Sequence, residues 1–414
     1  YLQKKSENGG WERQINGISN NEKAVLLLEK RTFKELLVDM ELRNLQNNIV
    51  GQEASRLFAR AEINMGVEAF RDSLYSLLKR NTFLNIKFEN MLDTLGEISR
   101  TDIRSLLGEW EKTTPLPFYS LGEPTLTKIT NKGGEEFFVL KMLISNNSDY
   151  DGIIHMDIRK DGWWYQPLED PRAKTKIEMP AHTSKEFVSV WEDQIRNVEI
   201  NTMVSGNLPN IISQDINNVK QERNKIVKDS IYILPESSFD LPGEIIVDNE
   251  DSTLFILSAP PIVGLLPKWL DEVEETPFKY SGISWWRPPL QWTATTNDRY
   301  YGKYIRSAFV IKSGDGSQTA TWKVPVPEVG QYDLYYHVFK DDELRWNDRL
   351  QGEYHFRVAY DSEMEDAYIN LRKANEGWEQ LGTYYFSADT VRVVLTDECK
   401  LRSVTADAVK IVKR

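Results

Sequence analysis

Four histidines and one cysteine are the residues of this 414-residue chain that could ligate a soft metal or act as a strong nucleophile. None of His155, His182, His337 and His355 has a second histidine four residues away, so the HExxH zinc motif is absent. Cys399 lies among acidic residues, which disfavour a reactive thiolate. The GxSxG, GxxxxGK[ST] and GxGxxG motifs are absent too. We therefore expect no catalytic residue, no metal site and no cofactor in this chain.

Aromatic residues form the second group that could do chemistry. Trp285, Trp286 and Trp292 lie around a Pro-Pro break, where neither a helix nor a strand period explains them as core positions. Exposed rings in such a loop can stack on sugars, or the rings can pin the loop to the domain. Tyr300 and Tyr301 are further glycan-binding candidates, with packing as the alternative.

Acidic residues offer weaker candidates. Asp248 and Asp251 could bind calcium together with backbone oxygens, and a capped turn is the alternative. A pair of carboxylates for glycoside hydrolysis cannot be picked out, because their separation is spatial and the chain has 63 acidic residues.

The net charge of -12 limits the partners. Residues 236–414 contribute most of it, with 20 basic and 29 acidic side chains. Such a surface repels nucleic acid and anionic membranes. No apolar run is long enough for a transmembrane segment, and the amino end lacks the apolar core of a targeting peptide, which we expect to be removed or absent.

The pattern of apolar residues predicts a multidomain α + β protein. Residues 1–115 show helical spacing, with one helix over about 20–46 and breaks at Gly51 and Gly66, which predicts an array of stacked antiparallel helices. Residues 116–235 show the alternation of an antiparallel β module. Residues 236–414 predict a jelly-roll-like β-sandwich with an insertion at about 256–291.

The first two segments resemble the non-catalytic carboxyl-terminal region of M1-type gluzincin aminopeptidases, over residues 20–210. The similar stretches are Gly66 to Phe83, Ser99 to Trp110, Leu116-Pro-Phe-Tyr, Phe137 to Ile144, Asn146-Asn-Ser-Asp and Asn201 to Pro209. The zinc motif and the substrate-amine glutamates of that family have no match here. The resemblance therefore implies an accessory region and not a peptidase.

The last segment, residues 245–414, resembles the golvesin or xanthan-lyase-like carboxyl-terminal domain. The similar stretches are Val247-Asp-Asn-Glu-Asp, Arg299 to Ala308, Ala320-Thr-Trp, Gly330 to Val338, Gly377 to Phe386 and Val404 to Val412. This resemblance implies a β-sandwich that binds carbohydrate or adheres to surfaces.

Together these features predict a non-catalytic accessory region of a bacterial extracytoplasmic M1-like peptidase, whose last domain binds glycan or cell envelope. We expect it in the periplasm, outside the cell or on the cell surface. The alternatives are a polysaccharide-active enzyme with unrecognised acidic residues and a protein-interaction scaffold.

The stretch from Pro235 to Gly243, rich in Ser and Pro, is the expected linker before the last domain. Limited proteolysis should cut there first and release a folded carboxyl-terminal fragment, which mass spectrometry would identify. First cleavage within the strands after Tyr332 would contradict this boundary.

Overall fold

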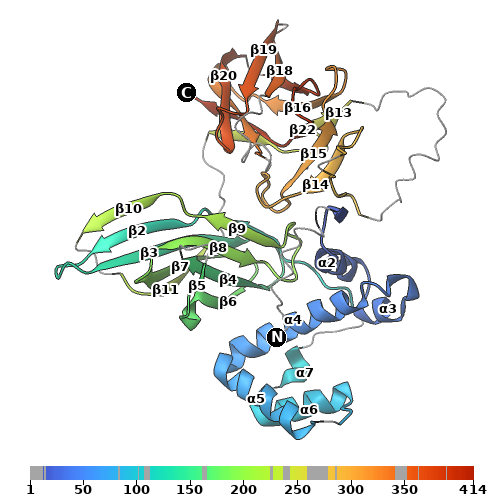
Figure 1. The fold of residues 1–414 in the computed structure, drawn as a ribbon, viewed down its shortest axis with the longest axis vertical. Helices are drawn as coiled ribbons and strands as arrows, with labels where there is room; N and C mark the ends of the chain where they lie inside the picture. Colours follow the sequence, from blue (N-terminus) through green and yellow to red (C-terminus); the bar gives the residue numbers. More distant parts are fainter. Residues whose placement is uncertain are drawn as a thin grey trace. The chain divides into compact units, whose positions relative to one another are not determined.

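The computed structural model, drawn as ribbons in Figure 1, describes most of the chain. The described residues are 13, 15–82, 84–100, 102–106, 112–160, 166–223, 227–235, 243–258, 278–284, 287–340, 352–361, 363–387 and 389–414. They fall into two compact units. One comprises the described residues from 20 to 235, and the other comprises those from 243 to 414 together with those up to Ser19.

The helices with the following bounds belong to the first unit. Their bounds are α2 (Asn20–Lys30), α3 (Phe33–Val38), η1 (Met40–Leu42), α4 (Gln46–Met65), α5 (Val67–Arg80), α6 (Phe88–Ser99) and α7 (Ile103–Leu106). The single helix expected over 20–46 is wrong. Thr32 and Glu35 form a capping box, in which the Glu35 N–H donates to Thr32 Oγ1 at 3.2 Å and the Thr32 N–H donates to Glu35 Oε2 at 2.9 Å. This cap starts a new helix where the apolar spacing alone indicated continuity.

The two glycines expected to end helices behave differently. Helix α4 runs through Gly51, so that predicted break is wrong. Gly66 does separate α4 from α5, with φ at +83°. A positive φ favours glycine, whereas a glycine inside a helix costs only about 1 kcal/mol relative to alanine.

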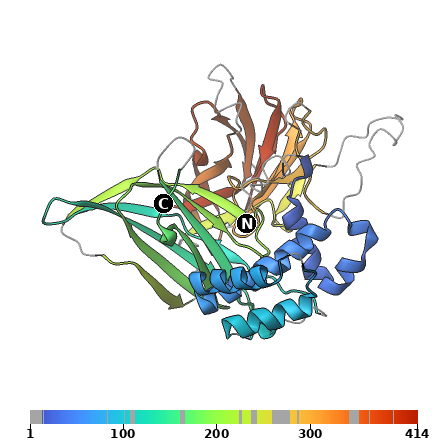
Figure 2. The same ribbon diagram turned by 60° about the horizontal axis from the view of Figure 1, so that its bottom comes forward.

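The predicted architecture of a helical array ahead of the β domains is also wrong. Strands account for about twice as many residues as helices, and they form several separate sheets. Helix α4 packs against β4 (Gly152–Lys160) and β6 (Lys174–Met179) of the same unit, as Figure 2 shows. This helix is thus partly covered by a sheet, which a self-contained array would not need. That residues 1–115 and 116–235 are separate domains stays a prediction.

Two sheets form the rest of the first unit. One has the order β10-β2-β3-β7-β11 with β1 also paired to β3, and the other has the order β5-β4-β8-β9 with β6 also paired to β4. Pairing is antiparallel except between β10 and β2. The remaining bounds are β1 (Tyr119–Leu121), β2 (Thr125–Thr130), β3 (Glu136–Asn146), β5 (Gln166–Pro167), η2 (Pro171–Ala173), β7 (Thr183–Trp191), β8 (Ile195–Asn201), β9 (Ile211–Asp215), β10 (Val219–Arg223) and β11 (Ser230–Pro235). Leu140 and Met142 of β3 share one core with Ile154 of β4 and Ile200 of β8, so the two sheets pack as a sandwich.

Strand β11 lies at the edge of its sheet. It pairs with β7, and no second partner occurs among the described residues. Its side chains are apolar yet exposed, with Tyr232 at 51% and Ile233 at 72% of their full accessible area.

Three sheets form the second unit. Their strand orders are β12-β23-β17-β20, β13-β16-β21-β18-β19 and β14-β15-β22. The bounds are β12 (Glu244–Val247), β13 (Phe255–Leu257), β14 (Thr293–Thr296), β15 (Ser307–Lys312), β16 (Thr319–Pro325), β17 (Gly330–Val338), β18 (Glu353–Tyr360), β19 (Glu363–Asn370), β20 (Gly377–Phe386), β21 (Thr390–Thr396), β22 (Ser403–Ala406) and β23 (Val409–Lys413). Residues 259–277 of the expected insertion lie outside the described residues.

Trp322 lies at the centre of this second unit. Its ring is fully buried and contacts those of Phe255 and Tyr336, with ring centroids 5.4 and 6.0 Å away. Its Nε1 donates to the backbone carbonyl of Asp407 at 3.2 Å. One core joins all three sheets around this ring, so the unit is a β-sandwich.

Replacing Trp322 therefore tests the core. We expect Trp322→Ala to lower the free energy of unfolding by about 3–5 kcal/mol, because a large buried ring leaves a cavity. Trp322→Phe, which keeps a ring but loses the Nε1 hydrogen bond, should cost less. Urea unfolding of both variants measures this, and an unchanged midpoint for Trp322→Ala would contradict the burial.

Candidate functional site

The candidate site lies on the outer face of the sheet β12-β23-β17-β20. Side chains alternate along β17, so Tyr336 and Val338 enter the core while Tyr335 and His337 point the other way. His337 is directly opposite Trp378 of β20, and Tyr335 is opposite Lys410 of β23. These cross-strand pairs bring aromatic and basic side chains together on one face.

We call Tyr301, Tyr335, His337, Trp378 and Lys410 the outer-face cluster. The centroid of the Trp378 ring is 5.0 Å from that of Tyr301 and 5.2 Å from that of His337. Lys410 Nζ lies 4.9 Å from the Trp378 centroid and 5.3 Å from that of Tyr335. All five side chains are only partly buried, so the cluster is a surface feature supported by ring contacts and cation–π contacts.

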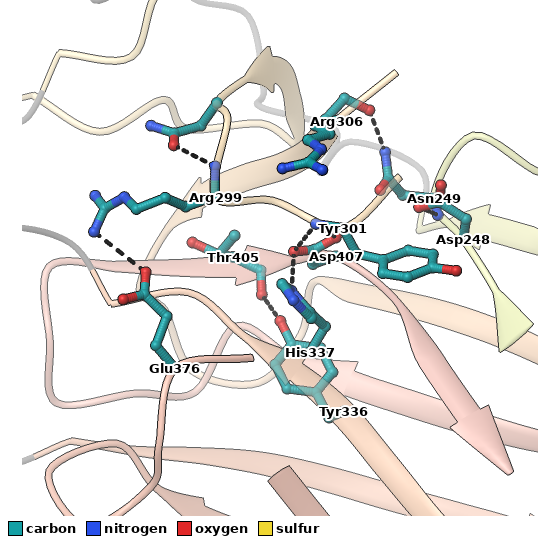
Figure 3. Close-up of polar contacts among 12 residues, drawn as sticks. Asp248, Asn249, Arg299, Tyr301, Arg306, Tyr336, His337, Glu376, Thr405 and Asp407 are labelled. Carbon is teal, nitrogen blue, oxygen red and sulfur yellow. Dashed lines mark hydrogen bonds and ion pairs between the residues drawn. The ribbon is translucent and has the colours of Figure 1, made fainter. Parts of the chain in front are cut away.

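Asp407 fixes the position of two members of this cluster, Tyr301 and His337. Its carboxylate is fully buried and accepts the Tyr301 backbone N–H, with N–O distances of 3.1 and 3.2 Å to its two oxygens. His337 Nδ1 lies 2.8 Å from Oδ2 of the same carboxylate (Figure 3). One buried group thus fixes both the loop that carries Tyr301 and the imidazole on the sheet. The other ring nitrogen of His337, Nε2, takes no part in the contact with Asp407.

The charges around the site are largely paired. Lys410 Nζ lies 3.0 Å from Glu244 Oε1. Arg299 Nη1 lies 3.2 Å from Glu376 Oε1, and the guanidinium stacks over Phe339 at 4.7 Å. Both cations next to the rings are therefore in ion pairs. A surface of this kind suits an uncharged ligand better than an ion.

A second polar group lies near Asp407. Burial, and then the neighbouring Asp407 carboxyl, raise the pKa of Asp248 well above its usual value. The Asn249 side chain is hydrogen-bonded to the Ser307 hydroxyl at 2.7 Å (Figure 3). Glu250 accepts from the Tyr280 hydroxyl at 3.0 Å and pairs with Lys279 Nζ at 2.6 Å. These contacts link the start of the domain to β15.

The two calcium candidates point into different networks. Asp251 Oδ1 accepts the Thr253 hydroxyl at 2.7 Å and the N–H groups of Thr253 and Leu254 at 3.1 and 3.3 Å, as in a capped turn. Asp248 Oδ1 accepts the Asn249 N–H at 2.7 Å. Among the residues that the structure describes, no group of three or more His, Cys, Asp or Glu side chains could hold a metal ion.

The structure divides the aromatic candidates. Trp285 and Trp286 lie outside the described residues. Trp292 packs against the sandwich core, and its buried Nε1 has no partner in the described part of the chain. Tyr300 is buried, with its ring centroid 4.6 Å from that of Phe339. Tyr301 is the one of these five that the structure places in the outer-face cluster.

Sequence reasoning missed the rest of the cluster. It did not include Trp378 among the candidates, and it treated His337 as an isolated histidine, although the alternation along β17 could have placed His337 on the outer face. Asp407 also carried a signal, since it is the one acid in the run Val404-Thr-Ala-Asp-Ala-Val, and a buried acid needs hydrogen-bond partners.

Comparison with known proteins supports one part of the sequence analysis. Residues 288–413 match the Golvesin C-terminal domain, and this stretch contains the whole outer-face cluster and Asp407. The M1-type resemblance of residues 20–210 is not supported. A search of curated proteins found no match.

Solved structures give weaker likenesses. A Bacteroides uniformis beta-glucuronidase has 12% identity and a TM-score of 0.20, with 77% of this chain and 32% of that chain covered. The Sulfolobus Turreted Icosahedral Virus structure has 9% identity and a TM-score of 0.15, with coverages of 73% and 94%. A GH31 alpha-xylosidase from Xanthomonas citri has 9% identity and a TM-score of 0.14, with coverages of 73% and 29%. The chain spans about a third of the length of the glucuronidase.

In the described part of the chain, no helix combines the length and the apolar character needed to cross a membrane.

The buried Asp407 carboxyl predicts a pH effect on stability. Burial raises its pKa, and the imidazole of His337 opposes the shift. As the pH rises from the usual carboxyl range, the unfolded chain releases this proton before the folded chain does, so the contribution of Asp407 to stability falls.

The substitution Asp407→Asn removes this titration. The free energy of unfolding of the wild type, relative to that of the variant, should therefore decrease between about pH 4 and pH 7. Urea unfolding of both proteins across this range measures it. A difference that stays constant or grows with pH would show that the carboxyl is not held in an unfavourable environment.

Proposed function

We propose that the Golvesin C-terminal domain of this chain binds a neutral glycan of the cell envelope or the extracellular surroundings through the outer-face cluster. The observation that carries the proposal is the position of Trp378, a large ring on the outer face of a sheet and not in the core. The rings of Tyr301 and His337 contact it, and Asp407 binds the backbone N–H of the first and the imidazole of the second. A ring held in this way loses little conformational entropy when a sugar stacks on it.

The family match supports this proposal, because golvesin-like domains are expected to bind carbohydrate or to adhere to surfaces outside the cytoplasm. The charge pattern supports a neutral ligand. Lys410 and Arg299 are each paired with a carboxylate, and residues 236–414 carry nine more acidic than basic side chains, 29 against 20. A polyuronate would be repelled by this surface.

The role of the chain beside an M1-like peptidase stays a prediction. The outer-face cluster needs no peptidase in order to bind a glycan, so the proposal does not depend on that role.

Affinity electrophoresis through gels that contain neutral or acidic polysaccharides tests the proposal. We expect a neutral polysaccharide to retard the wild type, and we expect Trp378→Ala to abolish the retardation, because the stacking surface is lost. Tyr385→Ala is the matched control, since Tyr385 is an aromatic residue of the same strand, 65% exposed and outside the cluster. The control should be retarded like the wild type.

Other results would overturn the proposal. Equal loss in both variants would mean that the cluster is not the binding surface. Stronger and salt-sensitive retardation by a polyuronate would contradict the preference for neutral sugars. Depolymerisation of the polysaccharide in the gel would favour a polysaccharide-active enzyme instead.

A further inference from the structure

The first unit contains a cavity of about 190 Å³ that the proposed glycan site does not use. Helix α4 forms one side with Arg56 and Arg60, which are four residues apart and so project from the same face. Tyr150, Asp151 and Gly152 form another side at the start of β4. Because an engineered cavity of about 150 Å³ holds benzene in another protein, this volume suits one small molecule.

The two arginines differ in their partners. Arg56 Nη2 lies 2.6 Å from Glu53 Oε2, and Thr114 Oγ1 donates to the other oxygen of Glu53 at 3.3 Å. Arg60 is half-buried and makes no hydrogen bond or ion pair with any residue that the structure describes. A guanidinium in this position has lost part of its hydration without receiving a partner from the described part of the chain, and an anionic ligand would compensate for that loss.

The electrostatics agree with this geometry. Burial, and then the charge of Arg56, lower the pKa of the Arg60 guanidinium, while Asp151 and Glu178 oppose the shift. Neither acid lies within ion-pair distance of Arg60 in the described structure. A carboxylate inside the cavity would provide the two parallel hydrogen bonds that a guanidinium favours.

Asp151 supplies a charge of the opposite sign in the wall. Its Oδ1 accepts the Ala181 N–H at 2.8 Å, and no described residue donates to its Oδ2. The remaining wall is mostly apolar, with Pro115, Pro117, Ile153, Met203 and Val204. The cavity thus combines a cation and a carboxylate oxygen that have no partner among the described residues with mostly apolar walls.

We propose that this cavity binds a small zwitterion with an apolar body, that is, an α-amino acid with an aliphatic side chain. Its carboxylate pairs with Arg60, its ammonium group contacts Asp151, and its side chain packs on the proline, methionine and valine walls. This site is independent of the proposed glycan binding, since all of its residues belong to the first unit.

Calorimetric titration of the full chain with three related ligands tests the proposal without any variant. L-leucine should bind. Both 4-methylpentanoate, which lacks the ammonium group, and 3-methylbutylamine, which lacks the carboxylate, should bind at least about tenfold more weakly, because each leaves one charged group of the cavity without a partner.

Variants then identify the residues. Arg60→Met should abolish leucine binding, and its melting temperature should not fall, because it removes a charge that has no partner. Arg71→Met is the matched control on α5, since Arg71 is exposed and lies outside the cavity. Asp151→Asn should bring the affinity for leucine close to that for 4-methylpentanoate.

Three outcomes would overturn the proposal. They are no leucine binding by the wild type, unchanged leucine binding by Arg60→Met, and equal affinity for leucine and 4-methylpentanoate. Either of the first two outcomes would show that the cavity is not a leucine-binding site. The third would show that the cavity does not prefer a zwitterion.

Discussion

Burial of the Asp407 carboxylate is the constraint on which the rest of the second unit depends. A buried carboxylate is tolerated only where hydrogen bonds satisfy its oxygens. Here the Tyr301 N–H and His337 Nδ1 do so, and the backbone carbonyl of Asp407 accepts from Trp322 Nε1 in the core. The same residue therefore ties a loop, an outer sheet face and the centre of the sandwich to one another. Displacement of the Tyr301 N–H or of His337 would remove a hydrogen bond from the buried carboxylate.

Strand β17 connects the buried Asp407 carboxylate to the outer-face cluster, because its residues alternate between the core and the outer face. Tyr336 closes the core and donates from its hydroxyl to the backbone of Thr405, whereas the neighbouring His337 lies on the outside with Trp378 and Lys410. A bulge between Leu334 and Tyr335 shifts the register against β20. Such bulges re-aim side chains near functional surfaces. The core and the proposed binding surface are thus built from alternate residues of one strand.

The sequence predicted much of what depends on local patterns and little of what depends on distant contacts. The alternation of apolar and polar residues indicated most strands. The ordered motifs after Arg299 indicated the Golvesin C-terminal domain. Thr32 and Glu35 show a local signal that was overlooked, since a capping box can be read directly. Trp322 and Trp378 look alike in sequence, yet only the register of β16 and β20 places one inside and one outside. That Arg60 makes no hydrogen bond or ion pair with a described residue has no sequence signal, because it depends on which distant segments the fold brings next to α4.

The exposed edge strand β11 would make the first unit prone to self-association if it were separated from the rest of the chain. Its outer backbone groups pair with no other described strand. Together with the apolar side chains, Ile231 and Ile233 on one face and Tyr232 and Leu234 on the other, they form an edge that can accept another strand. Natural sheets usually guard such edges with charge or proline, and here the proline comes only at the last position. A fragment ending at residue 235 would therefore be prone to edge-to-edge assembly into oligomers as its concentration rises, and a lysine at Ile233, the most exposed of the four, would be the simplest way to keep it monomeric.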